Sequence, residues 1–219
     1  MSGPAQHDYW ESPGRKGRRH PTHPVIEAYV LPKIELISRR IGIGKDTRLL
    51  DVGCGNGYFT YHFSKICDTS GVDYSRTMLD INPVKNTYLM DASALKFEDS
   101  SFDVVFCHAL LHHVEDPAKV VSEMARVARR HVVIIEPNRD NPLVLMFSLL
   151  KKEERGAMKF SMPYLKGVVE RAGLAIDEAL SFGIIVPNKT PASWLAALRP
   201  FDRRQPLGVV NIVIAEKRN

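Results

Sequence analysis

One stretch, Arg48–Asp73, constrains the fold of this chain more than any other. A short apolar run, Leu49-Leu50-Asp51-Val52, leads into Gly53-Cys54-Gly55-Asn56-Gly57, and a helical pattern and a second short strand follow. Strand, glycine turn, helix, strand and terminal acid is the layout of a nucleotide-binding half of a doubly wound sheet. Glycines let a ligand lie against the backbone, and the helix start presents free N–H groups to it. Asp73, 20 residues beyond Gly53, is placed to accept both hydroxyls of a ribose.

The spacing of the glycines limits the class of ligand that the turn can bind. A dinucleotide fingerprint, G-x-G-x-x-G, needs glycine at position 58, which is tyrosine here. No Lys-Ser/Thr pair closes the turn, so a phosphate cradle of the P-loop kind is excluded. The pattern present is G-x-G-x-G at Gly53, Gly55 and Gly57, preceded by Asp51.

Two segments carry a resemblance to a known family. LLDVGCGNG together with GVDYS closely resembles motif I and the acidic second strand of class I S-adenosylmethionine-dependent methyltransferases. The segment from Ser101 to Pro117, with its SFD start, buried strand, paired histidines and V-E-D-P end, is similar to the small-molecule branch called methyltransferase type 11. The likeness covers about residues 45–140 and thins beyond them.

The resemblance implies a fold and a cofactor. The fold is α/β and Rossmann-like, with a doubly wound seven-stranded sheet and helices on both faces. Its seventh strand, expected at residues 207–215, runs antiparallel between strands five and six. The cofactor is S-adenosyl-L-methionine, with S-adenosyl-L-homocysteine as product.

The expected cofactor-binding residues lie at the ends of consecutive strands. Glycines 53, 55 and 57 would lie along the methionine and ribose parts, Asp73 would hold the ribose, and Met78 would pack on the adenine. Asp91 and Ala92 fall where the family places an acid and a small residue beside the adenine, although Asp91 is also a turn or helix-cap acid. The full expected set is Asp51, Gly53, Cys54, Gly55, Asn56, Gly57, Asp73, Tyr74, Met78, Asp91, Ala92, Cys107 and His108.

Three histidines after the fourth strand are the candidate catalytic bases. An imidazole titrates near neutral pH, so His108, His112 or His113 is suited to remove a proton from an acceptor. The alternative is that these histidines pack or cap a helix. His108 and His112 have metal-type spacing, but no third ligand is evident nearby, so no metal is expected.

The chain divides into a leader and one domain. Residues 1–24 are rich in Gly, Pro, Arg and His, which argues against a regular element. They form either a flexible tail or a lid that buries Tyr9 and Trp10 over the cofactor. Residues 25–219 form a single methyltransferase domain, in which 140–205 supply cap and substrate-side segments. The apolar run Pro142–Leu150 either roofs an acceptor pocket or is an ordinary cap helix.

Composition and charge limit the partners. No apolar run is long enough to span a bilayer, the first residues lack a signal sequence, and three cysteines without metal spacing suggest a reduced, cytoplasmic compartment. The charge of +5 sits at the two ends, +2 in residues 1–24 and +3 in 199–219. Such ends suit nucleic acid, anionic lipid or an acidic substrate, or are simply solvated.

The sequence therefore favours transfer of a methyl group to a small-molecule or lipid-like acceptor. The segment after strand four is Cys107-His108-Ala109-Leu110 and lacks the Asn/Asp-Pro-Pro-aromatic turn of enzymes that methylate bases. Nucleic acid is therefore an unlikely partner, and a tRNA or rRNA methyltransferase is the first alternative. A cofactor-binding module without catalysis is the second. Contact with a membrane surface stays open, as do the acceptor, the atom methylated and the oligomeric state.

Overall fold

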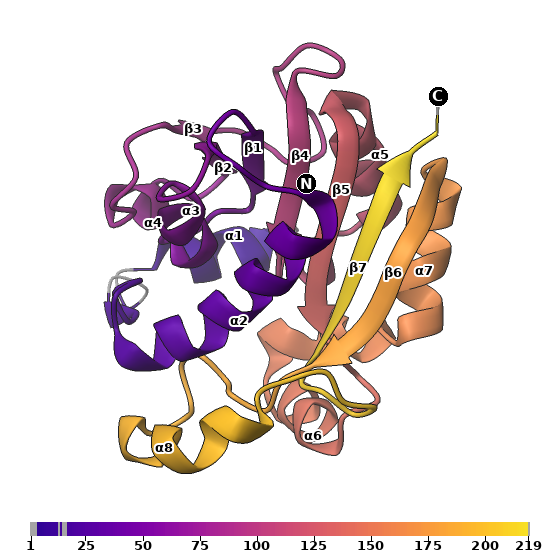
Figure 1. Cartoon of the computed structure of the whole chain (residues 1–219). Helices are drawn as coiled ribbons and strands as arrows, with labels where there is room; N and C mark the ends of the chain where they lie inside the picture. Colours follow the sequence, from indigo (N-terminus) through magenta and orange to yellow (C-terminus); the bar gives the residue numbers. More distant parts are fainter. Residues whose placement is uncertain (1–3, 13, 15–16, 219) are drawn as a thin grey trace.

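A computed structural model describes residues 4–12, 14 and 17–218 of the chain. Its centre is one seven-stranded sheet with the order β3-β2-β1-β4-β5-β7-β6 (Figure 1). The strands are β1 Arg48–Val52, β2 Asp68–Asp73, β3 Thr87–Leu89, β4 Phe102–His108, β5 Ala128–Pro137, β6 Leu174–Phe182 and β7 Val210–Lys217. The strands from β3 to β5 pair in parallel, whereas β7 pairs antiparallel with both β5 and β6. The expected fold class and the inserted antiparallel strand are confirmed.

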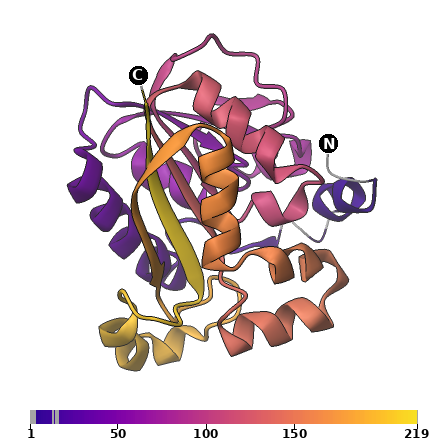
Figure 2. The same ribbon diagram turned by 90° about the vertical axis from the view of Figure 1, so that its right-hand side faces the viewer.

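Helices cover both faces of the sheet. The helices are α1 Pro4–Glu11, α2 Pro24–Ile41, α3 Tyr58–Phe63, α4 Arg76–Asp80, α5 Pro117–Val127, α6 Pro142–Leu150, α7 Met162–Arg171 and α8 Leu195–Leu198. Short 3-10 helices are η2 Leu111–His113, η3 Lys152–Lys159, η4 Ala192–Trp194 and η5 Arg199–Phe201. One buried cluster packs α2 and α3 against the sheet, and a second packs α5 and α7 against the opposite face (Figure 2).

Side-chain caps explain why several helices begin where they do. Ser75, Asp116 and Ser161 each accept a hydrogen bond from the third residue after them, so α4, α5 and α7 start directly behind them. Pro117 and Pro142 occupy the first turns of α5 and α6, where a missing N–H costs nothing.

The N-terminal residues differ from expectation. Composition argued against a regular element in residues 1–24, but Pro4–Glu11 forms α1. The helix packs on α4, where Thr77 Oγ1 donates to Glu11 and Ser75 Oγ donates to the Trp10 carbonyl oxygen at 3.2 Å. The prediction was wrong because these contacts lie more than 60 residues away in the chain and supply what local propensity does not.

Residues 142–160 and 184–207 together form a cap at one end of the sheet. Figures 1 and 2 both show α6 and α8 at the end toward which β5 runs, so the cap lies at the carboxyl ends of the parallel strands. A buried ion pair helps to attach it: Lys33 Nζ of α2 lies 3.5 Å from Asp202 Oδ2, and Asp202 Oδ1 accepts from the Ile184 and Ile185 N–H groups. In open α/β sheets this is the end at which ligands bind.

Candidate functional site

The glycine turn, Gly53–Gly57, joins β1 to α3. Gly53 and Gly55 have φ of 74° and 50°, and Gly57 has 86°. Glycine is required at position 57 for a second reason, because a Cβ there would lie 2.5 Å from Asn82 Oδ1. Asn82 in turn donates to the Gly55 carbonyl oxygen at 2.9 Å and so braces the turn. Asn82 was not predicted as a site residue, and its only signal in the sequence is its place in an Asn-Pro break after the Arg76–Asp80 helix.

Two carboxylates face this turn. Asp73, at the end of β2, accepts the Gly55 N–H on Oδ2 at 2.8 Å and the Ser75 N–H on Oδ1 at 2.9 Å. Asp51, at the end of β1, accepts from Thr60 Oγ1 at 2.6 Å. Burial raises the pKa of Asp51 to about 7, against the hydrogen bond from Thr60, and the nearby Asp73 charge adds to the shift. Asp51 therefore holds α3 against β1, and Asp73 is the acid that reaches the turn.

The other expected cofactor residues lie around the same turn. Met78 is buried, and its Cε would be 3.5 Å from a Cβ placed on Gly55. Asp91 forms a turn in which its Oδ1 accepts the Ser93 N–H at 2.8 Å, so the turn role of that acid is seen directly. Cys54 and Cys107 are buried and carry free thiols, with pKa values that burial raises well above the usual range. Their side chains are packing groups, and the Cys54 backbone is hydrogen-bonded to Val72 and Gly57.

The histidine turn, His108–His113, begins at the end of β4. It contains an unusual backbone position, because Ala109 has φ of 51°, and its N–H donates to the Ile135 carbonyl oxygen. Glu136, at the end of β5, holds the turn from inside by accepting the Leu110 and Leu111 N–H groups on Oε1 at 2.8 and 2.7 Å. Glu136 was not predicted as a site residue. Its signal is a single acid closing an otherwise apolar strand.

The three histidines of this turn have different surroundings. His108 Nε2 lies 2.8 Å from the Tyr29 hydroxyl, and the ring stacks near Phe59, while burial lowers the pKa of His108 to about 3. His112 Nδ1 lies 2.6 Å from Glu136 Oε2, and its Nε2 lies 3.3 Å from Glu154 Oε2. Burial opposes the charge of His112, but the two carboxylates outweigh it and raise its pKa to about 9.

His113 differs from both neighbours. Burial lowers its pKa well below the usual range, with the His112 charge adding to the shift. Its ring hydrogen-bonds to the Glu153 backbone, and Nδ1 has no partner in the part of the chain that the structure describes. His113 is thus a neutral imidazole whose buried Nδ1 lacks a hydrogen-bond partner among the described residues.

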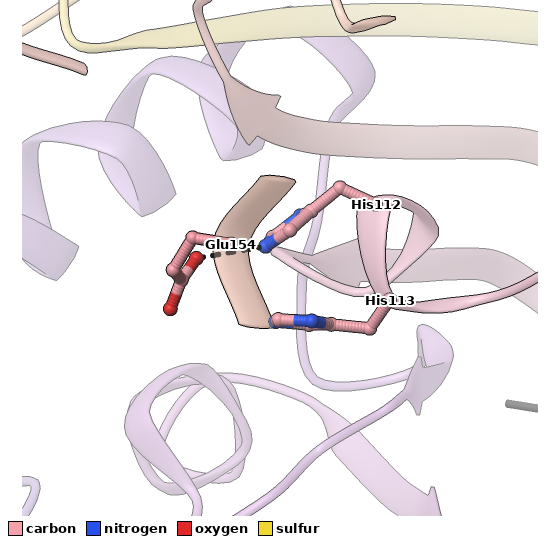
Figure 3. A group of neighbouring side chains, drawn as sticks. All are labelled: His112, His113 and Glu154. Atoms are coloured by element: carbon pink, nitrogen blue, oxygen red, sulfur yellow. Dashed lines mark ion pairs between the residues drawn. The ribbon is translucent and has the colours of Figure 1, made fainter. Parts of the chain in front are cut away.

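His112 and His113 also lie close to Glu154 of the cap. Figure 3 shows His112 and His113 converging on Glu154 of η3, with the ion pair to His112 drawn. Their ligand atoms lie within 4.8 Å of one another, so a third potential metal ligand exists that the sequence did not reveal. The His112 nitrogens face two carboxylates, those of Glu136 and Glu154, while His112 Nε2 and His113 Nδ1 have no hydrogen-bond partner among the described residues.

The N-terminal segment, of which the structure describes residues 8–12, 14 and 17–21, contacts both turns. The Trp10 ring meets His113 edge-on at 5.3 Å, and Tyr9 meets Trp10 in the same way at 5.2 Å. The Arg18 guanidinium lies between the Trp10 and Tyr58 rings, at 5.2 and 5.3 Å from their centroids. Its Nε is buried without a hydrogen-bond partner among the described residues.

Part of the chain is similar to a known protein family. Residues 50–135 match the family model described as a methyltransferase domain. The resemblance seen in the glycine turn and the second strand is thereby confirmed, and the match covers β1 to β5, which carry both turns.

The curated relatives of this chain are longer than the region that they share with it. The chain is 39% identical over 100 residues to phosphatidylethanolamine N-methyltransferase of Cereibacter sphaeroides, covering 40% of this chain and 49% of that protein. It is 32% identical over 138 residues to demethylmenaquinone methyltransferase of Staphylococcus aureus, covering 58% and 56%. The chain thus spans about half the length of the relatives it matches.

Solved structures share the fold along almost the whole chain. A putative methyltransferase of Haloferax volcanii, solved with the Trm112 methyltransferase activator, aligns with a TM-score of 0.70 at 16% identity and covers 97% of this chain and 98% of that chain. The YcgJ protein of Bacillus subtilis aligns with a TM-score of 0.64 at 20% identity and covers 86% and 99%. At these identities the likeness confirms the fold.

The raised pKa of His112 predicts a pH-dependent contribution to stability. The folded pKa of about 9 exceeds the ordinary 6.5, so the stabilisation is complete below pH ~6.5 and disappears as pH rises through about 9. His112→Asn keeps a donor toward Glu136 but cannot be protonated. Between about pH 6 and 9.5 the wild type should lose roughly 1–3 kcal/mol of unfolding free energy relative to this variant in urea titrations. Parallel pH curves for the two proteins would show that His112 is neutral when folded.

Proposed function

We propose that the protein is an S-adenosylmethionine-dependent methyltransferase that acts on a small, lipid-like acceptor. The observation that carries the proposal is the meeting of Asp73 with the glycine turn, inside a matched methyltransferase domain. The acceptor class is supported by two relatives whose names specify a phospholipid and a menaquinone precursor as substrates. Since the chain spans half of those relatives, their substrates define a class for this protein rather than its acceptor.

The residues around the glycine turn fit the cofactor. Asp73 offers carboxylate oxygens at the carboxyl end of β2 for the ribose hydroxyls, and Met78 offers an apolar surface beside Gly55 for the adenine. The buried Arg18 Nε, which lacks a hydrogen-bond partner among the described residues, suits the carboxylate of the methionine part. The backbone at Cys107 and His108 remains the expected contact for its amino group. When bound, the cofactor supplies a methyl group already activated on a sulfonium.

The remaining task of the protein is alignment and proton removal. Of the three histidines, His108 is engaged by Tyr29, and His112 is held as a cation between Glu136 and Glu154. His113 is neutral, its buried Nδ1 has no hydrogen-bond partner among the described residues, and its ring lies against Trp10 of the N-terminal segment. His113 is therefore the residue to accept a proton from the acceptor, and His112 positions it.

A transfer assay tests the function and the cofactor site together. Labelled S-adenosylmethionine should pass its methyl group to a component of a lipid extract, with a mass gain of one methylene in that component. Asp73→Ala should weaken binding of S-adenosylhomocysteine by about 2–3 kcal/mol in calorimetry, because charge-assisted hydrogen bonds are lost. Asp80→Ala, which removes an exposed carboxylate at the end of α4, is the matched control. Equal affinity for both variants would remove Asp73 from the cofactor site.

Replacement of the proposed base has a separate signature. His113→Gln should lower the rate of methyl transfer about 10²-fold or more, while cofactor affinity stays within a factor of about two. Because the pKa of His113 lies well below neutral, the wild-type rate should not fall as pH drops from about 8 to 7. A His113→Gln enzyme with wild-type turnover would exclude His113 as the base.

We also propose that the N-terminal segment is a lid over the cofactor. Besides α1 on α4, the segment is attached at its other end, where Asn56 Nδ2 donates to the Arg19 carbonyl oxygen at 3.0 Å. Arg19 itself donates to the Pro187 and Thr190 carbonyl oxygens of the cap, at 2.6 and 3.0 Å. These few polar contacts are of the kind that open locally, so the segment releases to admit the cofactor and then excludes water.

Hydrogen exchange distinguishes a lid from a permanently packed segment. Amides of residues 8–21 should exchange several-fold more slowly once S-adenosylhomocysteine is bound, because Arg18 gains a partner and the segment is held down. Amides of Val168–Arg171, at the end of α7, serve as the internal control. Trp10→Ala should reduce the protection. Identical exchange in residues 8–21 with and without ligand, together with full activity of a chain beginning at Pro24, would contradict the lid.

A further inference from the structure

Helix α6 carries an apolar face that is open to solvent. Leu143, Met146, Leu149 and Leu150 have exposed fractions of 67%, 54%, 55% and 75%. Their spacing of three and four residues places them on one side of the helix. On the other side Ser148 is buried and donates to the Val144 carbonyl oxygen. Four large apolar side chains in one exposed row are a feature that a soluble surface does not need.

The rest of the cap carries further exposed apolar side chains. Trp194, Phe201 and Leu207 have exposed fractions of 61%, 58% and 53%. Asn141 Nδ2 donates to the Leu207 carbonyl oxygen at 2.6 Å, and Lys189 Nζ lies 5.2 Å from the Phe147 ring, which joins α6 to both cap loops. In both ribbon views α6 and α8 lie at the same end of the molecule (Figures 1 and 2). We call Leu143, Met146, Leu149, Leu150, Trp194, Phe201 and Leu207 the docking surface.

The exposed charges of the cap have one sign. In residues 142–159 and 184–207 the exposed ionisable side chains are all basic, whereas Glu153 and Glu154 are half-buried and Asp202 is buried. The exposed basic residues are Lys151, Lys152, Arg155, Lys159, Lys189, Arg199, Arg203 and Arg204. Apolar side chains and a tryptophan among lysines and arginines are the composition of a surface that sits at an anionic membrane interface.

The docking surface belongs to the segments that enclose the candidate site. Arg19 of the N-terminal segment bonds to cap carbonyls, and Glu154 of η3 reaches His112. A molecule that leaves a bilayer beneath the cap therefore needs to travel only past these segments to reach the histidine turn. No helix in the described ranges is long and apolar enough to cross a membrane, so any such contact is made from one side.

We propose that the cap docks on the surface of an anionic lipid bilayer, with α6 lying in the plane of the interface. The proposal deepens the proposed function, because it identifies where a lipid-like acceptor would enter. The nine residues of α6 are about 14 Å long, too short to span but sufficient to embed one face among the headgroups. The basic side chains then face lipid phosphates, and the exposed row leaves water.

Vesicle sedimentation with the full chain tests this docking. The protein should bind vesicles that contain equal parts of phosphatidylcholine and phosphatidylglycerol, and should bind phosphatidylcholine alone at least ten-fold more weakly. The triple change Met146→Ser, Leu149→Ser and Leu150→Ser should lower binding to the mixed vesicles at least ten-fold. Lys151→Ala and Lys152→Ala should each lower the affinity for the mixed vesicles roughly five-fold, and added salt should weaken this binding.

A matched control comes from the opposite edge of the sheet. Tyr88→Ser and Leu89→Ser remove exposed apolar side chains of β3, at 41% and 48% exposure, and should leave vesicle binding unchanged. Absence of wild-type binding to the mixed vesicles, or equal loss in the α6 and β3 variants, would overturn the proposal. So would a dimer in sedimentation velocity that only the α6 variant dissociates, because that result assigns the face to a second copy.

The outcome is independent of the proposed activity. Methyl transfer to a lipid extract presented in detergent does not require docking, so activity there without vesicle binding would leave the proposed function standing and remove the docking surface. Vesicle binding without methyl transfer would support the docking surface and contradict the proposed function. All variants should bind S-adenosylhomocysteine as the wild type does, since none of the changed residues lies at the glycine turn.

Discussion

The buried carboxylate of Glu136 organises the end of the molecule that matters for function. It has no exposed surface, and its two oxygens accept from the Leu110 and Leu111 N–H groups and from His112 Nδ1. A buried charge costs several kcal/mol unless such partners surround it, so the turn after β4 has to fold around this acid. The positive φ of Ala109 is the backbone conformation through which it does so. Removal of Glu136 would leave three donors without an acceptor.

The cap depends on the same turn. The His112 ring links Glu136 of the sheet to Glu154 of η3 by an ion pair on each side. Gly156 of η3 lies so close to the turn that a Cβ at this position would overlap the His112 carbonyl oxygen. Paired histidines that look alike in sequence thus perform different tasks. One is an ionic connection between sheet and cap, and the other is left neutral beside Trp10. Their separation into a cation and a free base follows from one carboxylate being buried next to one of them.

The parts predicted well from sequence are those encoded by neighbouring residues. The turn glycines Gly53, Gly55 and Gly57 act within a few positions, and their positive φ angles fit the turn expected after the first strand. The inserted antiparallel strand came only from the family resemblance, and pairing confirms it. The missed features join distant positions: α1 to α4, Asn82 to the glycine turn, and Glu154 to His112 across 42 residues. Propensity and spacing carry no information about such pairs until the fold brings them together.

The two basic ends of the sequence illustrate this difference. Both have the same sign and similar size, and composition alone treats them as equivalent. In the structure Arg18 and Arg19 turn inward, one toward the aromatic rings near the glycine turn and the other to carbonyl oxygens of the cap. Arg199 and Arg203 instead stay exposed beside the apolar cap. The arginines near the N-terminus therefore contribute to the candidate site, whereas those near the C-terminus contribute to an exposed surface. The difference arises because the burial and the neighbours of an arginine, rather than the net charge of its segment, determine which groups it binds.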